Sequence, residues 1–165
     1  YSREQAIDLV AQIRERIPDA ALRTTLLLGF PGETEEDVQE MESFLRDTEL
    51  DHVGVFAYAS EEGSAAVKFS HQVEEEEKQV RLQRIITLQS EISRRRLQRF
   101  VSRVEPVLVE GVSKETDLLL EGRTRYQAPD IDGCVLINEG ETRSGEIVRV
   151  EITEAQTYDL VGRIV

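Results

Sequence analysis

Apolar side chains at the start of the chain follow a helical spacing and then a continuous run. Ser2 with Gln5 forms a capping-box start, and the apolar positions after it predict a helix that ends before Pro18. Residues 24–28 form a short, mostly apolar run, which is typical of a parallel strand covered on both faces. We therefore expect a helix followed by a buried strand.

The next sixty residues repeat this alternation and end in a long helix. Thr34 is a candidate N-cap for a helix that reaches about Thr48, because three acidic residues follow it. Residues 52–58 are a second apolar run of strand length, and residues 74–100 carry one long helical pattern. Strands that alternate with helices predict an α/β arrangement.

The long helical pattern has acidic residues at its start and basic residues at its end. This polarity suits the helix dipole, so we interpret both charge runs as structural. A contact of the arginines with RNA or a partner is the alternative. The basic run comprises Arg94, Arg95, Arg96 and Arg99.

From residue 102 onward, short segments rich in valine, leucine and isoleucine are separated by turn residues. Such segments predict an all-β domain, and five of them suggest a small OB-like barrel whose loops and one strand face carry ligand contacts. The expected strands lie near residues 104–110, 118–122, 134–138, 146–153 and 158–165. We therefore expect two domains, 1–101 and 102–165.

Charge narrows the range of partners. The formal net charge is -13; residues 1–101 hold 13 basic and 20 acidic side chains, and residues 102–165 hold 7 and 13. An acidic surface opposes a phosphate backbone and favours a basic protein. No apolar run approaches the ~20 residues that span a bilayer, so we expect a cytoplasmic protein with no membrane partner.

Few side chains suggest independent chemistry. Cys134 is the single cysteine, so it can form neither an internal disulfide nor a Cys-based metal site, and we expect a small buried strand residue there. His52 and His71 lack the spacing of metal ligands or of a catalytic triad, and we expect structural roles for both. No catalytic residue and no metal ligand is predicted.

The turn after the first strand, Gly29-Phe30-Pro31-Gly32-Glu33-Thr34, is the most informative motif. Its glycines allow close backbone approach to a ligand, and the next helix begins with free amide groups. It is not a phosphate-binding Walker loop, because no Gly-Lys-Ser/Thr follows and the helix opens with acidic residues. A Gly-x-x-Gly loop of the KH kind is disfavoured because a strand precedes it. A plain strand-to-helix turn is the remaining alternative.

Several stretches taken together, and in order along the chain, resemble one family. They are residues 22–25, 29–34, 56–63, 127–133 and 158–162. The family is RimO, the ribosomal protein methylthiotransferases, which are radical-SAM enzymes. The resemblance implies that residues 1–101 are the last strands and helices of a radical-SAM (β/α) barrel and that residues 102–165 are a TRAM domain.

The resemblance also implies cofactors. The parent enzyme would use S-adenosylmethionine and two 4Fe-4S clusters, held by a Cys-x-x-x-Cys-x-x-Cys loop and by cysteines of a preceding domain. Neither cysteine set is in this sequence. Because cluster irons need thiolates, we expect no cluster in this chain and no activity of the chain alone. The residues that the resemblance places beside S-adenosylmethionine are Gly29, Phe30, Pro31, Gly32, Glu33, Phe56 and Tyr58.

The implied reaction transfers a methylthio group to an aspartate of the twelfth small-subunit ribosomal protein, which the TRAM domain would dock. Asp130, Asp132 and Asp159 are candidate contacts with its basic surface, although turn formation explains Asp130 and Asp132 equally well. The open strand edge of a partial barrel further predicts self-association through residues 22–58.

Two alternatives remain at this stage. The tRNA methylthiotransferase MiaB shares the Gly29–Thr34 turn and the TRAM domain, but residues 126–133 resemble the ribosomal-protein enzyme, and the acidic TRAM region also favours it. The chain could instead be an RNA-binding barrel with a helical extension, in which Arg123, Arg125 and Arg143 contact phosphates.

Overall fold

A computed structural model describes residues 2–165; residue 1, where the first expected domain begins, lies outside the described residues. Contacts divide the chain into two compact units, one reaching to Ile92 and one comprising residues 93–165. The helix α3 (Glu75–Leu97) is continuous through Ile92. The domain boundary expected after residue 101 stays a prediction.

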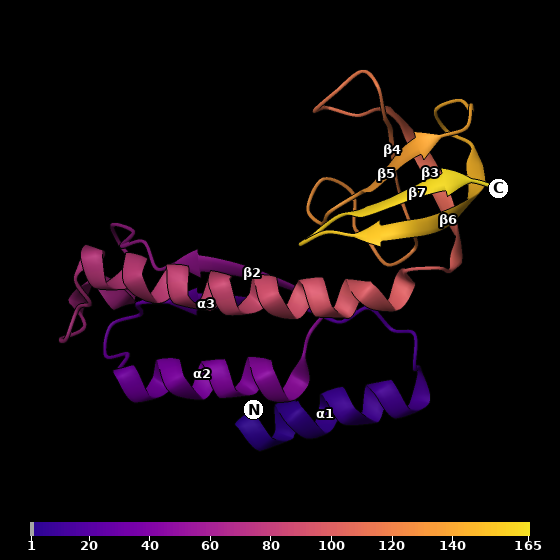
Figure 1. The fold of residues 1–165 in the computed structure, drawn as a ribbon. Coiled ribbons are helices and arrows are strands. Elements are labelled where there is room, and N and C mark those ends of the chain that lie inside the picture. Colours follow the sequence, from indigo (N-terminus) through magenta and orange to yellow (C-terminus); the bar gives the residue numbers. More distant parts are fainter. Residues whose placement is uncertain (1) are drawn as a thin grey trace. The chain divides into compact units, whose positions relative to one another are not determined.

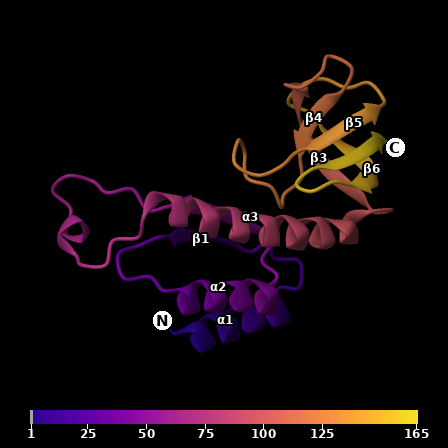
Figure 2. The same cartoon turned by 60° about the vertical axis from the view of Figure 1, so that its left-hand side comes forward.

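The first unit is built around two parallel strands joined by a helix. Strands β1 and β2 pair in register from Arg23 opposite His52 to Leu28 opposite Ala57. Helices α1 and α2 lie side by side in both views (Figures 1 and 2). The elements are α1 (Arg3–Arg16), β1 (Arg23–Leu28), α2 (Glu35–Thr48), β2 (His52–Ala57), the 3-10 turn η1 (Ala65–Lys68) and most of α3.

Both predicted helix starts are confirmed. The Ser2 and Thr34 side chains accept the amide of the residue three positions on, and that residue's side chain accepts the cap amide in return. Each exchange satisfies two amide groups that a helix end otherwise leaves without partners. The sequence therefore determines where α1 and α2 begin.

Within residues 2–165, one face of the two-stranded sheet is packed and the other is open. A core formed by α2, α3 and that face contains Leu28, Val38, Leu45, Ile85 and Ile92. The expectation that residues 24–28 are covered on both faces is wrong in this structure. Leu27 is 47% exposed and its cross-strand partner Phe56 is 58% exposed, because α2 and α3 pack on one side of the sheet.

The second unit contains a closed five-stranded barrel, as expected for an OB-like fold. The strand order is β3-β4-β5-β7-β6, and pairing of β3 with β6 closes it. Leu97, the last residue of α3, and Phe100, in the 3-10 turn that follows it, belong to the barrel core. The strands are β3 (Val104–Val112), β4 (Leu120–Arg123), β5 (Val135–Glu139), β6 (Ile147–Ala155) and β7 (Leu160–Ile164), preceded by the 3-10 turn η2 (Gln98–Phe100).

The fold class, α/β followed by all-β, is confirmed. Two strands with their helices form part of a sheet, and the barrel follows them in the chain. Within residues 2–165, none of the helices is both long enough and apolar enough to cross a membrane.

Candidate functional site

The Gly29–Glu33 turn leaves the end of β1 in a conformation that requires glycine. Gly29 has a φ of 74° and Gly32 a φ of 92°, a region in which residues with a Cβ are strained. A Cβ on Gly29 would also lie 2.3 Å from Cγ of Lys78, whereas a Cβ on Gly32 would meet nothing within 4 Å. Gly29 therefore serves close packing on α3, and Gly32 leaves open space above the turn.

Glu33 closes the turn from within. Its Oε1 accepts hydrogen bonds from the Gly29 amide at 2.9 Å and from Nη1 of Arg81 at 2.8 Å. The side chains of Glu33 and Arg81 are 8% and 10% exposed. Burial lowers the pKa of Arg81, but hydrogen bonds to Glu33 and Glu77 outweigh it and hold this pKa above its ordinary value. Glu33 and Arg81 therefore form a buried ion pair that joins the turn to α3.

Aromatic rings gather beside the turn. The Phe30 ring meets Tyr58 edge-on with centroids 5.2 Å apart and meets Phe69 at 6.1 Å. The Lys78 ammonium lies 5.5 Å from the centroid of the Tyr58 ring. The Tyr58 amide donates to the Leu28 carbonyl at 2.7 Å, continuing the β1–β2 pairing by one residue. These contacts form an aromatic and cationic edge at the carboxyl ends of the strands.

The Tyr58 hydroxyl is the unusual atom of this edge. It is buried, and it has no hydrogen-bond partner among the described residues. Burying such a group without a partner costs about 1–3 kcal/mol, so orphan hydroxyls are uncommon and call for a water or ligand that satisfies them. The hydroxyl therefore marks a place where a polar ligand atom would be stabilised.

The structure brings most of the predicted cofactor residues together, with one exception. Gly29, Phe30, Gly32, Glu33 and Tyr58 share the end of the sheet, and Pro31 lies between them in the turn. Phe56 instead lies on the open face of the sheet, opposite Leu27. Among residues 2–165, the ring contacts around the turn involve Phe30, Tyr58 and Phe69 and do not include Phe56.

Sequence reasoning missed three neighbours of the turn: Phe69, Lys78 and Arg81. Phe69 follows η1 in a loop, where no periodic pattern pointed to it. Lys78 and Arg81 are nearly buried and lie three residues apart, seven and four residues before the core residue Ile85. Their helical spacing with the apolar positions of α3 was the available signal.

The described residues do not fit an iron-sulfur cluster. No group of three or more His, Cys, Asp or Glu side chains within residues 2–165 could hold a metal ion. Burial, together with the nearby Asp159 carboxylate, raises the pKa of Cys134 to about 12, so this thiol is a poor ligand. Cys134 directly precedes β5 and is half-buried, not fully buried within a strand as expected.

The three predicted docking aspartates line one pocket in the barrel unit. Its volume is about 230 Å³, and its acidic lining residues are Glu110, Glu115, Glu121, Asp130, Asp132 and Asp159. Lys114 and Arg123 are its two cationic side chains, which leaves a formal charge of -4. A pocket of this sign attracts cationic groups.

The three aspartates differ in their exposure and in their hydrogen-bond partners. Asp159 accepts the Cys134 amide and Asp132 accepts the Ala128 amide, both at 2.7 Å, so these two hold the loop that forms the pocket wall. Asp130 has an 84% exposed side chain and a 3.4 Å ion pair with Lys114. Asp130 is therefore the most available of the three, and the other two shape the pocket.

Two of the three arginines suggested for phosphate contact have protein partners. The Nε of Arg123 donates to Glu110 at 2.9 Å in the acidic pocket. The Arg125 guanidinium lies 4.8 Å from the centroid of the Tyr126 ring. Arg143 lies in the exposed loop before β6. Arg123 therefore lies among acidic side chains, which oppose binding of a phosphate.

Comparison with known proteins gives a consistent result. Residues 101–165 match the TRAM domain model. The whole chain is 54% identical to the ribosomal protein uS12 methylthiotransferase RimO of Desulfotalea psychrophila, covering 37% of that protein. The proteins of the same name from Geobacter sulfurreducens and Bdellovibrio bacteriovorus are 47% and 44% identical over 98% and 99% of the chain, and 36% of each is covered.

The match covers this chain completely but its relatives only in part. The chain spans about 37% of the length of these curated relatives, in their C-terminal part. The resemblance seen in the sequence is confirmed, and the barrel agrees with the TRAM match. The chain is a homologue of the C-terminal part of the RimO ribosomal protein uS12 methylthiotransferases, including their TRAM domain.

Proposed function

We propose that this chain is the C-terminal part of a radical-SAM methylthiotransferase that transfers a methylthio group to an aspartate of ribosomal protein uS12. The similarity along the entire chain to proteins named for this activity carries the proposal. The enzyme would act in the cytoplasm, where ribosomal proteins are made and assembled. The chain alone would lack the activity, since Cys134 is its only thiol and clusters need several.

The first unit would contribute to S-adenosylmethionine binding. Open space at Gly32, the aromatic edge of Phe30 and Tyr58, and the orphan Tyr58 hydroxyl fit a ligand with both a ring and polar groups. S-adenosylmethionine would supply the methyl group and the radical chemistry of the parent enzyme. Pro31 and Phe56 complete the proposed cofactor-binding set, and Glu33 belongs to it through the hydrogen bond that its carboxylate accepts from the Gly29 amide.

A titration of the chain with S-adenosylmethionine tests this role. In Tyr58→Phe, we expect affinity to fall by roughly tenfold if the hydroxyl contacts the ligand. The same variant should unfold at the same or a higher denaturant concentration, because the hydroxyl that it removes is buried without a partner. Unchanged affinity in Tyr58→Phe would remove Tyr58 from the site.

The barrel unit would dock the substrate. Ribosomal proteins are basic, and the pocket lined by Asp130, Asp132 and Asp159 combines a concave shape with a formal charge of -4. A lysine or arginine side chain of uS12 entering this pocket would meet carboxylates. Asp130 is the exposed contact, whereas Asp132 and Asp159 would act mainly by holding the pocket in shape.

Charge reversal tests the docking role. Asp130→Lys combined with Glu121→Lys should weaken uS12 binding by about tenfold or more, since both changes place cations in the pocket. Glu141→Lys combined with Glu154→Lys is the matched control, because it changes the net charge equally and both residues are exposed and do not line the pocket. Equal losses in the pocket and control variants would indicate nonspecific attraction and would exclude the pocket as the docking site.

Binding of tRNA is the second candidate function. The observation in its favour is the stacking of Arg99 on Phe100 and of Arg125 on Tyr126, with centroid distances of 4.9 and 4.8 Å, since aromatic–arginine surfaces also stack with nucleobases. The net charge of -13 opposes it. A tRNA affinity that falls steeply with salt would support this alternative.

Self-association is a further proposed interaction. Among residues 2–165, β1 and β2 pair only with each other, so both outer edges of their sheet and its face at Leu27 and Phe56 are uncovered. Exposed strand edges promote pairing between chains. We expect residues 22–58 to mediate a dimer or a larger assembly of this chain, and a monomer by light scattering would contradict this.

A further inference from the structure

The ion pair between Arg81 and Glu33 connects the middle of the chain to the glycine turn. The Nη1 atom of Arg81 donates to Glu33 Oε1 at 2.8 Å and to the Glu33 carbonyl oxygen at 3.1 Å. The same Oε1 accepts the Gly29 amide at 2.9 Å. Both side chains are about nine-tenths buried, so solvent and salt screen this contact weakly. Arg81 and the Gly29 amide therefore share one carboxylate oxygen as their acceptor.

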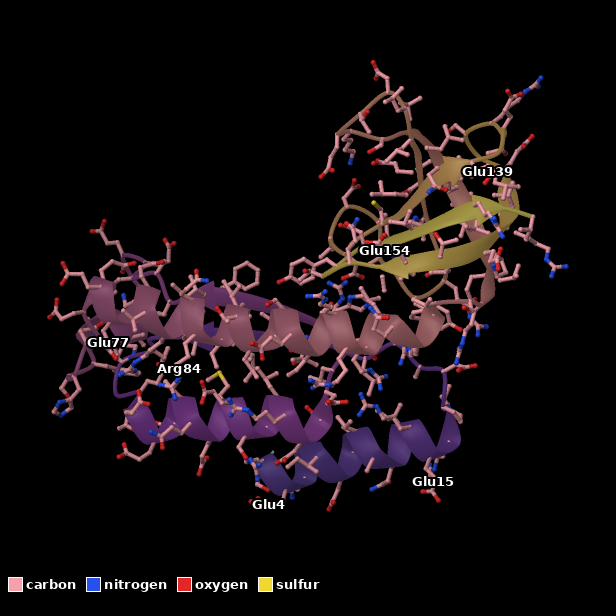
Figure 3. The ribbon with its side chains drawn as sticks, viewed as in Figure 1. Glu4, Glu15, Glu77, Arg84, Glu139 and Glu154 are labelled. Carbon is pink, nitrogen blue, oxygen red and sulfur yellow. The ribbon has the colours of Figure 1, made fainter. Side chains whose placement is uncertain are left out.

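Arg81 is itself held in a fixed orientation. Its Nε donates to Glu77 Oε1 at 2.9 Å, one helical turn earlier in α3. Figure 3 labels Glu77 near the start of that helix. Arg81 thus uses different nitrogen atoms for its two carboxylate partners, an arrangement that the single ammonium of lysine cannot reproduce.

A second side chain of α3 supports the same turn. The aliphatic part of Lys78 occupies the space in which a Gly29 Cβ would lie, with Cγ 2.3 Å from that position. Lys78 and Arg81 are three residues apart and therefore share one side of the helix. The turn is thus held at Gly29 by contact with Lys78 and at Glu33 by hydrogen bonds with Arg81.

We propose that Arg81 is a positioning residue that sets the conformation of the Gly29–Glu33 turn through the Glu33 carboxylate. The inference rests on the proposed function, in which this turn lies beside S-adenosylmethionine. Its consequence is that α3 arranges the turn backbone before the ligand binds, and pre-arranged groups bind without a further loss of conformational freedom. The Glu33 carboxylate then acts on the turn and does not act as a direct ligand contact.

The Gly29 amide gives a direct readout in the full chain. In Arg81→Met, we expect the Gly29 amide to exchange its hydrogen about tenfold faster and to shift in the ¹H–¹⁵N spectrum, while barrel amides stay unchanged. Arg81→Lys should give an intermediate result. Arg84→Met is the matched control, because Arg84 makes ion pairs with Glu35 and Glu42 at 2.6 and 2.5 Å and none with the turn.

A charge swap separates positioning from simple stabilisation. Arg81→Glu with Glu33→Arg restores an ion pair of the reverse orientation, but an arginine side chain at position 33 has no oxygen that could accept the Gly29 amide. We expect this double variant to recover part of the unfolding midpoint lost in Arg81→Met without recovering the Gly29 signal. A Gly29 amide that is unchanged in Arg81→Met, or fully recovered in the swap, would overturn the proposal.

Dialysis against labelled S-adenosylmethionine completes the test. A roughly tenfold weaker binding in Arg81→Met, with Arg84→Met like the wild type, is the expected outcome. Equal binding by the wild type and Arg81→Met would refute positioning at this site. If the wild-type chain binds no S-adenosylmethionine, the proposed cofactor role of the chain fails, and the Gly29 amide measurement still decides whether Arg81 sets the turn.

Discussion

The two units of the chain treat their strand edges in opposite ways. In the barrel, every strand has two neighbours, because β3 pairs with β6 and closes the sheet. In the first unit, β1 and β2 have only each other among the described residues. A closed sheet has no edge to offer another chain, whereas an open one does. The barrel is therefore the self-sufficient part, and the first unit is the part that needs further covering.

The candidate sites follow the same difference. The Gly29–Glu33 turn lies at the carboxyl ends of β1 and β2, the end of the strands at which parallel barrels form their sites. The acidic pocket is formed by side chains of barrel strands and loops, with Asp132 and Asp159 anchoring backbone amides. The first site therefore depends on support from α3, and the second depends on the loops of the barrel.

The closed barrel should protect Cys134 from chemical modification. Burial and the Asp159 carboxylate raise the pKa of this thiol from 9.0 to about 12. At pH 8 the folded thiol should therefore react with iodoacetamide at least about a hundred times more slowly than the unfolded thiol. Mass spectrometry of native and urea-treated chain measures both rates. Equal rates would show that the barrel does not shield its thiol.

A substitution in the barrel wall should be the most destabilising single change. A Cβ on Gly133 would lie 1.9 Å from the Tyr158 carbonyl oxygen, so Gly133→Ala should lower the free energy of unfolding of the barrel by about 2–4 kcal/mol. Gly145→Ala, where φ is 90° but space is open, should cost about 1 kcal/mol. Urea unfolding compares them, and equal effects would count against the close approach.

The open sheet predicts an association defect. Leu27→Ser with Phe56→Ser should weaken self-association by about tenfold and leave the unfolding midpoint nearly unchanged, because both side chains are about half exposed. Leu9→Ser with Ile17→Ser, which are 50% and 59% exposed, is the matched control. Sedimentation velocity measures the change. A similar loss in the control pair would show that association does not use the sheet.

In the first unit, a modest dependence of the free energy of unfolding on pH is expected. Arg84 lies between α3 and α2 (Figure 3), and its hydrogen bonds hold the pKa of Glu42 below its ordinary value. The stability from a lowered carboxyl pKa is present at neutral pH and is lost as pH falls through the folded pKa. Glu42→Gln should therefore cost about 1 kcal/mol at pH 7 and less near pH 3, by urea unfolding. A constant difference would contradict this origin.

Local signals explain how much of the fold was predictable. Ser2 and Thr34 begin their helices through bonds to residues three positions away, so the sequence alone specified α1 and α2. Short segments rich in valine, leucine and isoleucine, separated by turn residues, predicted the five barrel strands. The parallel pairing of β5 with β7 was not foreseen, because it depends on contacts across 25 residues, as in Val135 opposite Leu160. The open face of β1 was missed since its apolar run suits burial on both sides.

Part of the candidate site was likewise predictable from the sequence, and part of it was not. The glycine turn was found from local composition, and the three aspartates were found from the family resemblance. The ion pair between Arg81 and Glu33 joins residues 48 positions apart, and a single sequence gives no sign of such a pair. Lys78 was hidden because a charged residue after four glutamates suggests an exposed helix face, whereas its stem packs on Gly29.

The most direct test of substrate docking in the acidic pocket is a calorimetric titration of this chain with ribosomal protein uS12 and, separately, with tRNA, at low and moderate salt. Substrate docking in the acidic pocket predicts saturable binding to uS12 that the Asp130→Lys, Glu121→Lys double variant weakens, and no comparable binding to tRNA. Binding to tRNA alone, unaffected by these pocket changes, would contradict it.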